Sequence, residues 1–178
     1  VIASDWLGHV KTKQKALEAC TRAWVLCLDS DEPVEADLAE SIAAFVRADG
    51  VVGGRTHDGA MVNRKIWYRG RFLNHAWQPE WRLRLVRRGR AWWGGHDPHD
   101  KLMLESGSPA RLTGTLRHES FETFADQFAK DSGYARMMAG NLHKAGKRGS
   151  RVRCLASPTG AFLKQMVVKQ AWRDGRAG

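Results

Sequence analysis

The chain has 178 residues, of which 43% are hydrophobic and 27% are charged. This length fits one domain with a hydrophobic core, and this composition excludes a disordered or low-complexity protein. The formal net charge of +10 predicts attraction to polyanions, namely nucleic acid, an anionic lipid surface or phosphorylated small molecules.

The amino-terminal part is predicted to alternate helix and strand. Residues 11–24 have apolar positions at helical spacing, and residues 24–28 form a short apolar run that is typical of a buried strand. Pro33 suits the first turn of a second helix. This helix is expected to end before Gly50, and its apolar stripe consists of Leu38, Ile42, Phe45 and Val46.

Strands are predicted for the middle of the chain. Residues 51–52 and 61–68 look extended on either side of a glycine-rich turn, and residues 81–87 alternate leucine with arginine. Residues 111–117 are expected to form a further strand. The order strand, helix, strand predicts an α/β fold with a mixed sheet flanked by helices.

The last third of the chain is predicted to be helical. Ser120 is a suitable N-cap for a helix that continues past Gly133. Its apolar stripe includes Phe121, Phe124 and Phe128. A loop rich in lysine, arginine and glycine follows, and residues 159–175 are expected to form an amphipathic helix whose apolar side faces either the core or a lipid surface.

These elements predict a main domain over residues 1–119 and a helical extension over residues 120–178 that packs on it. The three cysteines have neither the spacing of a zinc site nor the even number of a disulfide framework, so we expect them to be reduced. The first residues lack a signal-peptide pattern, and no run approaches about 18 apolar residues. We therefore expect a cytoplasmic protein.

The stretch WVLCLDSDEPV, residues 24–34, leads from an apolar run directly into Asp29, Asp31 and Glu32. Carboxylates at the carboxyl edge of an α/β sheet lie where such folds bind ligands, and they suit Mg²⁺ or Mn²⁺ together with substrate phosphates. The alternative is that Ser30 or Asp31 caps the next helix while Glu32 complements its dipole. This pattern alone leaves both interpretations open.

Four segments, in their order and spacing, resemble glycosyltransferase family 2, in the branch of lipopolysaccharide core and related cell-envelope sugar transferases. They are DWLGHVKTKQKALEACTRAWVLCLDSDEPV, NRKIWYRGRFL, WQPEWRLRLVRRGRAWWGGHDPHDKL and LRHES. The resemblance covers nearly the whole chain. It implies a partial GT-A fold, which is Rossmann-like, and inverting transfer from a nucleotide-sugar donor to a glycan or lipid-linked acceptor with Mg²⁺ or Mn²⁺.

The resemblance also implies a set of site residues. Asp29 and Asp31 match the aspartates that bind the donor and the metal. His99 and Asp100 match the family's His-Glu pair, and both are expected to be catalytic, with Asp100 as the general base. The alternatives are that Asp97 is the base, or that both aspartates cap a turn around Pro98. Arg84 matches the first arginine of the family's Arg-Leu-Phe-Arg-Arg run, and it is expected to act on phosphate or to be a solvated strand residue.

Four more residues are assigned from the same resemblance. Lys13 is expected to meet the diphosphate of the donor, or to be plain surface charge. His118 is expected to be a metal ligand, although a single histidine is often structural. Trp81 and Glu32 are expected on the acceptor side, with core packing as the other role for tryptophan.

The resulting main prediction is a sugar transferase that lies on the inner face of the plasma membrane, attracted to its anionic lipids. Members of the family begin with a strand and helix that form the nucleotide-base pocket, so the chain is expected to be the middle of a longer protein. A nucleic-acid-binding module without catalytic activity would also explain the positive charge. A metal-dependent phosphohydrolase would use the same aspartates, but the sequence lacks the further acidic residues and histidines that would bind a second metal. No nucleic acid is expected as a partner.

Overall fold

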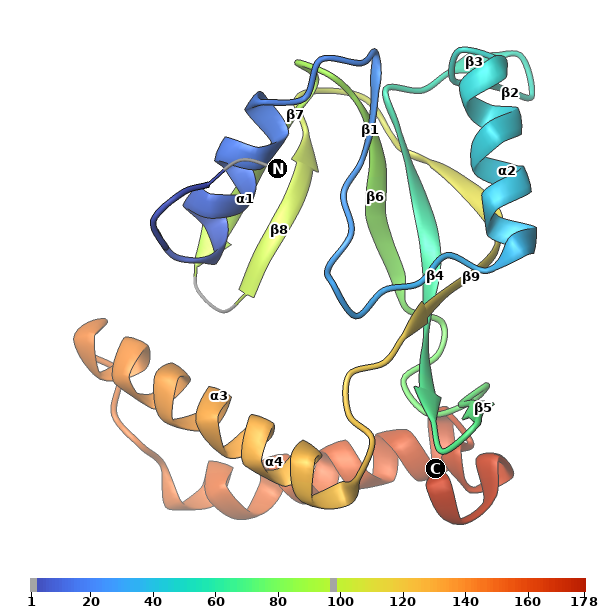
Figure 1. Ribbon diagram of the computed structural model, residues 1–178. Coiled ribbons are helices and arrows are strands. Elements are labelled where there is room, and N and C mark those ends of the chain that lie inside the picture. Colours follow the sequence, from blue (N-terminus) through green and yellow to red (C-terminus); the bar gives the residue numbers. More distant parts are fainter. Residues whose placement is uncertain (1–2, 97–98) are drawn as a thin grey trace. The chain divides into compact units, whose positions relative to one another are not determined.

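The computed structural model describes residues 3–96 and 99–178 (Figure 1). The chain divides into two compact units. The first unit contains Val1–Arg64 and Trp81–Arg117, and the second contains Lys65–Glu80 and His118–Gly178. The second unit therefore joins the predicted helical extension with a segment from the middle of the chain.

The first unit is built around a sheet with helices against it. Its helices are α1 (His9–Glu18) and α2 (Ala36–Arg47). Its sheet strands are β1 (Trp24–Leu26), β4 (Gly59–Tyr68), β6 (Trp81–Arg87) and β9 (Ala110–His118), of which β4 and β9 each run on into the second unit. Two hairpins are added, formed by β2 (Val51–Val52) with β3 (Arg55–Thr56) and by β7 (Ala91–His96) with β8 (His99–Leu104).

The sheet is mixed, as predicted. Strand β6 lies between β1 and β4 and pairs antiparallel with both, and β9 also pairs with β4. The chain direction in Figure 1 shows β9 running the same way as β4. Together with the helices, this arrangement confirms the prediction of an α/β fold, and it is compatible with a Rossmann-like glycosyltransferase fold.

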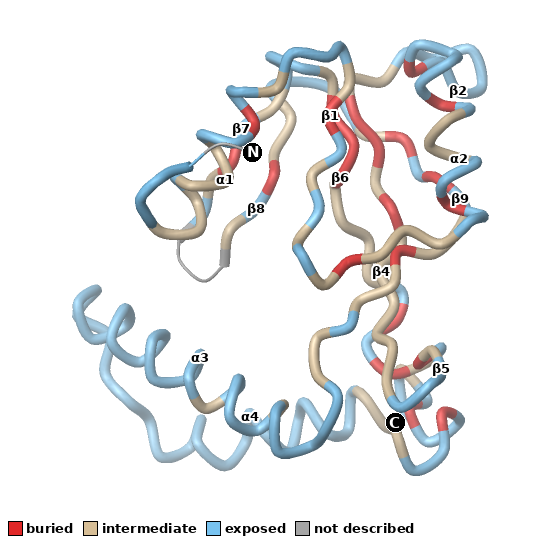
Figure 2. The backbone as a smooth tube through the Cα atoms, viewed as in Figure 1, coloured by how far each residue is buried: buried red, intermediate tan, exposed pale blue. Residues whose placement is uncertain are grey.

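The two faces of the sheet are covered by different elements, because successive side chains of a strand point to opposite faces. Leu85 of β6 packs with Leu38 and Phe45 of α2, in a core that continues onto β4 and β9. The next residue, Val86, packs instead with Leu17 of α1, and the same cluster includes residues of the β7–β8 hairpin. Figure 2 shows these buried positions along the central strands. The β7–β8 hairpin and α1 thus share one face of the sheet.

Helix α2 begins later than predicted. Its N-cap is Glu35, and no side chain caps it, so neither Ser30 nor Asp31 has the capping role that was the alternative for the acidic stretch. The Pro33 carbonyl accepts a hydrogen bond of 2.9 Å from the Arg117 backbone, and the next residue bridges to β9. This pairing holds the segment extended, so the prediction that Pro33 lies in the first helical turn is wrong.

A glycine allows β9 to approach α2 closely. Gly114 has φ +102°, a conformation that side chains rarely adopt, and a Cβ atom there would overlap the backbone of Asp37 and Leu38. The close approach brings β9 against the start of α2 and completes the core on that face of the sheet.

The second unit is mostly helical. It contains α3 (Phe124–Lys144), α4 (Arg151–Leu163), a π-helical turn η1 (Lys164–Val168), a 3₁₀ segment η2 (Ala171–Ala177) and β5 (Arg71–Phe72), which pairs with the end of β4. Its small core is formed by Leu73, Ala76 and Ala171. Within the described residues, no helix has both the length and the apolar character needed to cross a bilayer.

Two predicted helix boundaries are wrong. The N-cap of α3 is Thr123, whose side chain forms a reciprocal capping box with Asp126, and not Ser120. Phe121 lies before the helix and packs on Tyr68, with ring centroids 5.5 Å apart. The last helix begins at Arg151 instead of residue 159. The helical conformation is interrupted at Gln170, whose φ is +54°.

Asp174 ties the end of the chain to the segment that follows β5. Its carboxylate accepts backbone hydrogen bonds from Asn74, His75 and Ala76 at 2.9, 2.8 and 2.8 Å. Burial alone would raise the pKa of Asp174, but these three hydrogen bonds outweigh it, so the pKa lies below the ordinary value of 3.8. The ionised carboxylate is therefore part of the folded second unit.

We expect Asp174→Ala to destabilise the second unit by about 3 kcal/mol, because three backbone donors lose a charged acceptor. The pKa of Asp174 is lower in the folded state, so its contribution is complete above about pH 4 and is lost as the pH falls further. Urea unfolding measured from pH 7 to pH 3 checks this. Asp131→Asn, which removes an exposed carboxylate of α3, should leave stability unchanged; an equal effect of both changes would contradict the role given to Asp174.

Candidate active site

The acidic turn after β1 is fixed to the sheet by its backbone. The Cys27 backbone N–H donates to the Arg84 carbonyl of β6 at 2.7 Å, just before the turn. Within the turn, the Glu32 backbone donates to the Asp29 carbonyl at 3.1 Å, and the Asp29 backbone donates to Glu32 Oε2 at 3.2 Å. Asp29 and Glu32 are thus hydrogen-bonded to each other beside β6, and neither side chain caps α2.

Glu32 is buried between two arginines. Its side chain has 0% exposed surface, and its Oε1 accepts a hydrogen bond of 3.0 Å from Arg64 Nη1 of β4. Arg84 Nη2 donates to the same oxygen and also to Asp29 Oδ2, the latter at 2.8 Å. A buried carboxylate is costly unless it is paired. The two arginines provide this pairing, and Arg84 also holds Asp29 in place.

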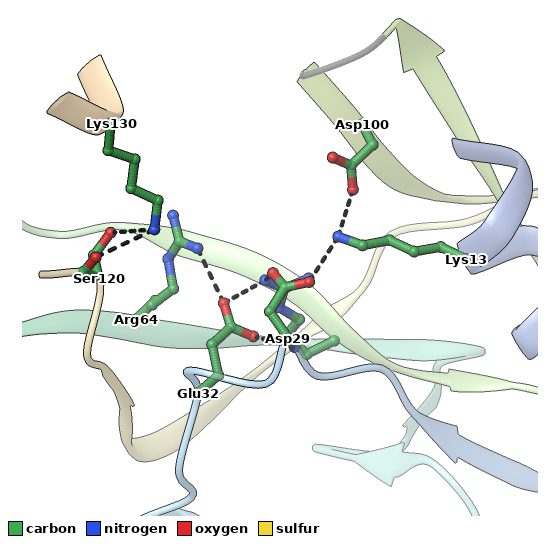
Figure 3. A network of polar contacts seen from close by, with 8 residues as sticks. Lys13, Asp29, Glu32, Arg64, Asp100, Ser120 and Lys130 are labelled. Carbon is green, nitrogen blue, oxygen red and sulfur yellow. Dashed lines mark hydrogen bonds and ion pairs between the residues drawn. The ribbon is translucent and has the colours of Figure 1, made fainter. Parts of the chain in front are cut away.

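Lys13 joins the acidic turn to Asp100. Its Nζ lies 2.7 Å from Asp29 Oδ1 and 2.8 Å from Asp100 Oδ2 (Figure 3). The ammonium also lies 4.7 Å from the ring centroid of Trp93 in β7. Lys13 comes from α1 and Asp100 from β8, so three elements meet at one ammonium group. The structure therefore brings together Lys13, Asp29 and Asp100, three of the residues predicted for the site.

The charges of this group stabilise one another. Burial alone would raise the pKa of Asp29, but the hydrogen bond from Lys13 and the charge of Arg84 outweigh it, so the pKa lies below its ordinary value. Burial alone would lower the pKa of Lys13, and the hydrogen bonds to Asp100 and Asp29 raise it instead. Asp29 and Lys13 are thus both ionised at neutral pH. The nearby Cys27 is protonated at neutral pH and is a poor nucleophile, since burial raises the pKa of its thiol to about 11.

As far as the described residues show, a divalent cation at this site would take part of its ligands from a substrate. Among the described residues, no three His, Cys, Asp or Glu side chains are grouped to hold a metal ion. Both oxygens of Asp29 already contact a protein cation, Lys13 on one and Arg84 on the other. Asp31 is a half-buried carboxylate in the same turn. Because Mg²⁺ is commonly held by one or two carboxylates plus phosphate oxygens and water, Asp31 suits such an ion.

The other predicted site residues are Trp81, His118 and His99, together with Asp97, the alternative to Asp100. Trp81 begins β6, and the Arg111 guanidinium stacks 5.1 Å from its ring centroid. His118 ends β9 and belongs to the second unit. Asp97 and the side chain of His99 lie outside the described residues. The acceptor role of Trp81 and Glu32, the metal role of His118 and the catalytic role of His99 and Arg84 stay predictions.

Arg64 is a site residue that sequence reasoning missed. It lies on β4 and pairs with Glu32, 32 positions earlier in the chain. The available signal was an arginine inside a largely apolar strand, since a guanidinium in such a place needs a carboxylate partner. The sequence does not say which of the many carboxylates this partner is.

Comparison with curated proteins gives relatives that are named as glycosyltransferases. The chain is 28% identical over 183 residues to the lipopolysaccharide core biosynthesis glycosyltransferase LpsC of Rhizobium meliloti, covering 97% of this chain and 63% of that protein. It is 25% identical to uncharacterized glycosyltransferases of Rickettsia typhi and Rickettsia prowazekii, covering 100% of this chain and 63% of each relative. No protein-family model matches the chain. These similarities support a relationship to glycosyltransferases, of whose length the chain spans 63%.

We expect a double-mutant cycle to detect coupling between Lys13 and Asp100. The free energies of unfolding of Lys13→Met, Asp100→Asn and the double variant should give an interaction energy of about 1 kcal/mol, as for a partly buried ion pair. The same cycle with Lys11→Met, which removes an exposed lysine of the same helix, should give none. Equal coupling for Lys11 and Lys13 would show that the effect is general electrostatics and not this contact.

Proposed function

We propose that the protein is a glycosyltransferase that moves a sugar from a nucleotide-diphosphate donor to a hydroxyl group of the lipopolysaccharide core or another cell-envelope glycan. We further propose inversion at the anomeric carbon and dependence on Mg²⁺ or Mn²⁺. One observation carries this proposal. The ammonium group of Lys13 contacts both Asp29, in the turn after β1, and Asp100. The named relatives support the same class of enzyme.

Asp100 is the proposed general base. An inverting transfer needs a group that takes the proton of the acceptor hydroxyl, and a carboxylate within hydrogen-bonding reach can do so. The side chain of Asp100 is 12% exposed, and Lys13 contacts its Oδ2. Oδ1 is the atom we assign to the acceptor hydroxyl.

Lys13 is the proposed contact for the diphosphate of the donor. An ammonium group has three N–H donors, and the two carboxylates Asp29 and Asp100 use two of them. The third donor is able to bind a phosphate oxygen without breaking either ion pair. Negative charge on the departing diphosphate grows in the transition state, so a cation fixed beside it stabilises that state.

Asp31 is the proposed protein ligand of the divalent cation. When bound, the ion supplies further positive charge at the leaving diphosphate. Asp29 would join as a ligand only if Lys13 left its Oδ1, because both oxygens of Asp29 contact protein cations. Arg84 and Arg64 keep the acidic turn in position through Glu32. We place the reaction at the cytoplasmic face of the inner membrane, where a lipid-linked acceptor would lie.

We expect Asp100→Asn to lower kcat for sugar transfer by about 10² to 10⁴, which is the usual contribution of a general base. The KM for the donor should change little, because Asp100 contacts the donor site only through Lys13. Steady-state kinetics with the purified protein over a range of nucleotide sugars measures both constants. Glu40→Gln, an exposed change on α2, is the matched control, and near-normal kcat for Asp100→Asn would remove this residue from the mechanism.

We expect Asp31→Asn to abolish the effect of Mn²⁺ on donor binding while leaving metal-free binding intact. The reason is that Asp31 holds the ion, whereas Lys13 contacts the diphosphate directly. Isothermal calorimetry with nucleoside diphosphates, with and without Mn²⁺, measures the difference. Should the variant keep a full Mn²⁺ effect, the ion would have to be held by other residues.

A further inference from the structure

Three elements of the second unit have no core of their own. Not one residue of α3, α4 or η1 is buried. Large apolar side chains are exposed instead, including Phe124 at 71%, Leu155 at 78% and Val168 at 71%. Figure 2 shows both long helices exposed along almost their whole length. A helix of 21 residues is rarely stable in water without a packed apolar side, so these elements need a partner.

The exposed apolar residues are arranged in stripes. On α3 Phe124, Phe128, Met138 and Leu142 form the stripe, Tyr134 lies at its edge, and Met137 lies away from it. On α4 the stripe consists of Val152, Leu155, Phe162 and Leu163. Members of each stripe are separated by close to whole numbers of 3.6-residue turns, or by one position around the helix, so each stripe lies on one side. Arg153 falls on the other side of α4, opposite the apolar stripe.

The same unit carries most of the net positive charge. It has 14 Lys and Arg against 6 Asp and Glu, a net charge of +8, whereas the first unit has 15 against 13, a net charge of +2. Residues 144–153, which connect α3 to α4, contain five basic residues and no acidic one. The charge is therefore concentrated beside the apolar stripes and not around Asp29 and Asp100.

We propose that α3, α4 and η1 form a docking surface for an anionic phospholipid bilayer, and that they lie along its headgroup region without crossing it. Apolar side chains enter the boundary of the acyl chains, while the 144–153 segment contacts anionic headgroups. Trp172, which follows η1 and is 61% exposed, is a suitable residue for that boundary.

Other occupants fit these observations less well. A second copy would bring two surfaces of net charge +8 together, which costs electrostatic energy. A nucleic acid would satisfy the charge but would leave valine, leucine and phenylalanine side chains in water. An anionic bilayer satisfies both features at once. The inference deepens the proposed location of the transferase and rests on the proposed function only for its biological purpose.

The test is co-sedimentation of the protein with vesicles of phosphatidylcholine alone or mixed with phosphatidylglycerol, in low and high salt. We expect binding to the anionic vesicles, weakened by salt because exposed charges are screened. The double variant Phe124→Ser/Phe128→Ser should bind at least about tenfold more weakly, since two large apolar side chains no longer enter the acyl-chain boundary. Lys147→Glu/Arg148→Glu should lose the preference for anionic lipid.

The controls carry equivalent changes in the first unit. Val51→Ser/Val52→Ser removes two apolar side chains that are 45% and 44% exposed, and Arg22→Glu reverses an exposed charge. Both should bind vesicles normally, and circular dichroism should show all variants folded. Equal binding by the Phe124/Phe128 variant, or equal binding to neutral vesicles, overturns the proposal. So does a stable dimer in sedimentation velocity that these phenylalanine changes dissociate.

The outcome is independent of the proposed chemistry. Sugar transfer to a soluble acceptor should persist in the Phe124→Ser/Phe128→Ser variant, because no residue of the active-site network is changed. Loss of lipid binding with transfer retained supports the docking surface. Lipid binding by a protein that shows no transfer with any nucleotide sugar would uphold the surface and refute the transferase.

Discussion

The first unit depends on pairing carboxylates with cations at one end of its sheet. Glu32 is fully buried, and Asp29 and Asp100 are mostly covered, so each would be costly without a nearby positive charge. Arg64 and Arg84 compensate Glu32, and Lys13 compensates the other two carboxylates. These contacts also join α1, β1, β4, β6 and β8, which come from distant parts of the sequence. The geometry of the candidate site is thus set by the same interactions that make its burial possible.

The net charge of +10 is distributed unevenly between the two units, with +2 on the first and +8 on the second. Around Asp29 the cations are committed to carboxylates, so the first unit is nearly neutral and has little excess charge to attract a polyanion. The excess lies on the second unit beside exposed apolar side chains. A nucleic-acid-binding module would explain that charge alone, but it explains neither the apolar stripes nor the relatives named as glycosyltransferases.

Local patterns in the sequence predicted most elements, whereas contacts between distant segments explain the error at Pro33 and the missed role of Arg64. The apolar stripe of α2 and the alternation of β6 were sufficient because each follows from one segment. Pro33 was misplaced because β9, more than 80 residues later, pairs with that segment. For the site, resemblance supplied Lys13, Asp29 and Asp100, but composition and spacing do not reveal that one ammonium bridges both carboxylates. Arg64 was missed for the same reason, since its partner is defined only in three dimensions.

The state of Asp29 has a consequence for how a metal ion would act in this protein. Both oxygens of Asp29 contact protein cations, Lys13 and Arg84, and the proposed mechanism assigns the incoming divalent ion to Asp31 of the same turn. An ion with one protein ligand binds weakly by itself, and its remaining ligands come from phosphate oxygens and water. Metal and donor should therefore each increase the affinity of the protein for the other by the same factor. In the proposed mechanism the substrate therefore supplies most ligands of the ion, so the affinity for Mn²⁺ would report donor binding.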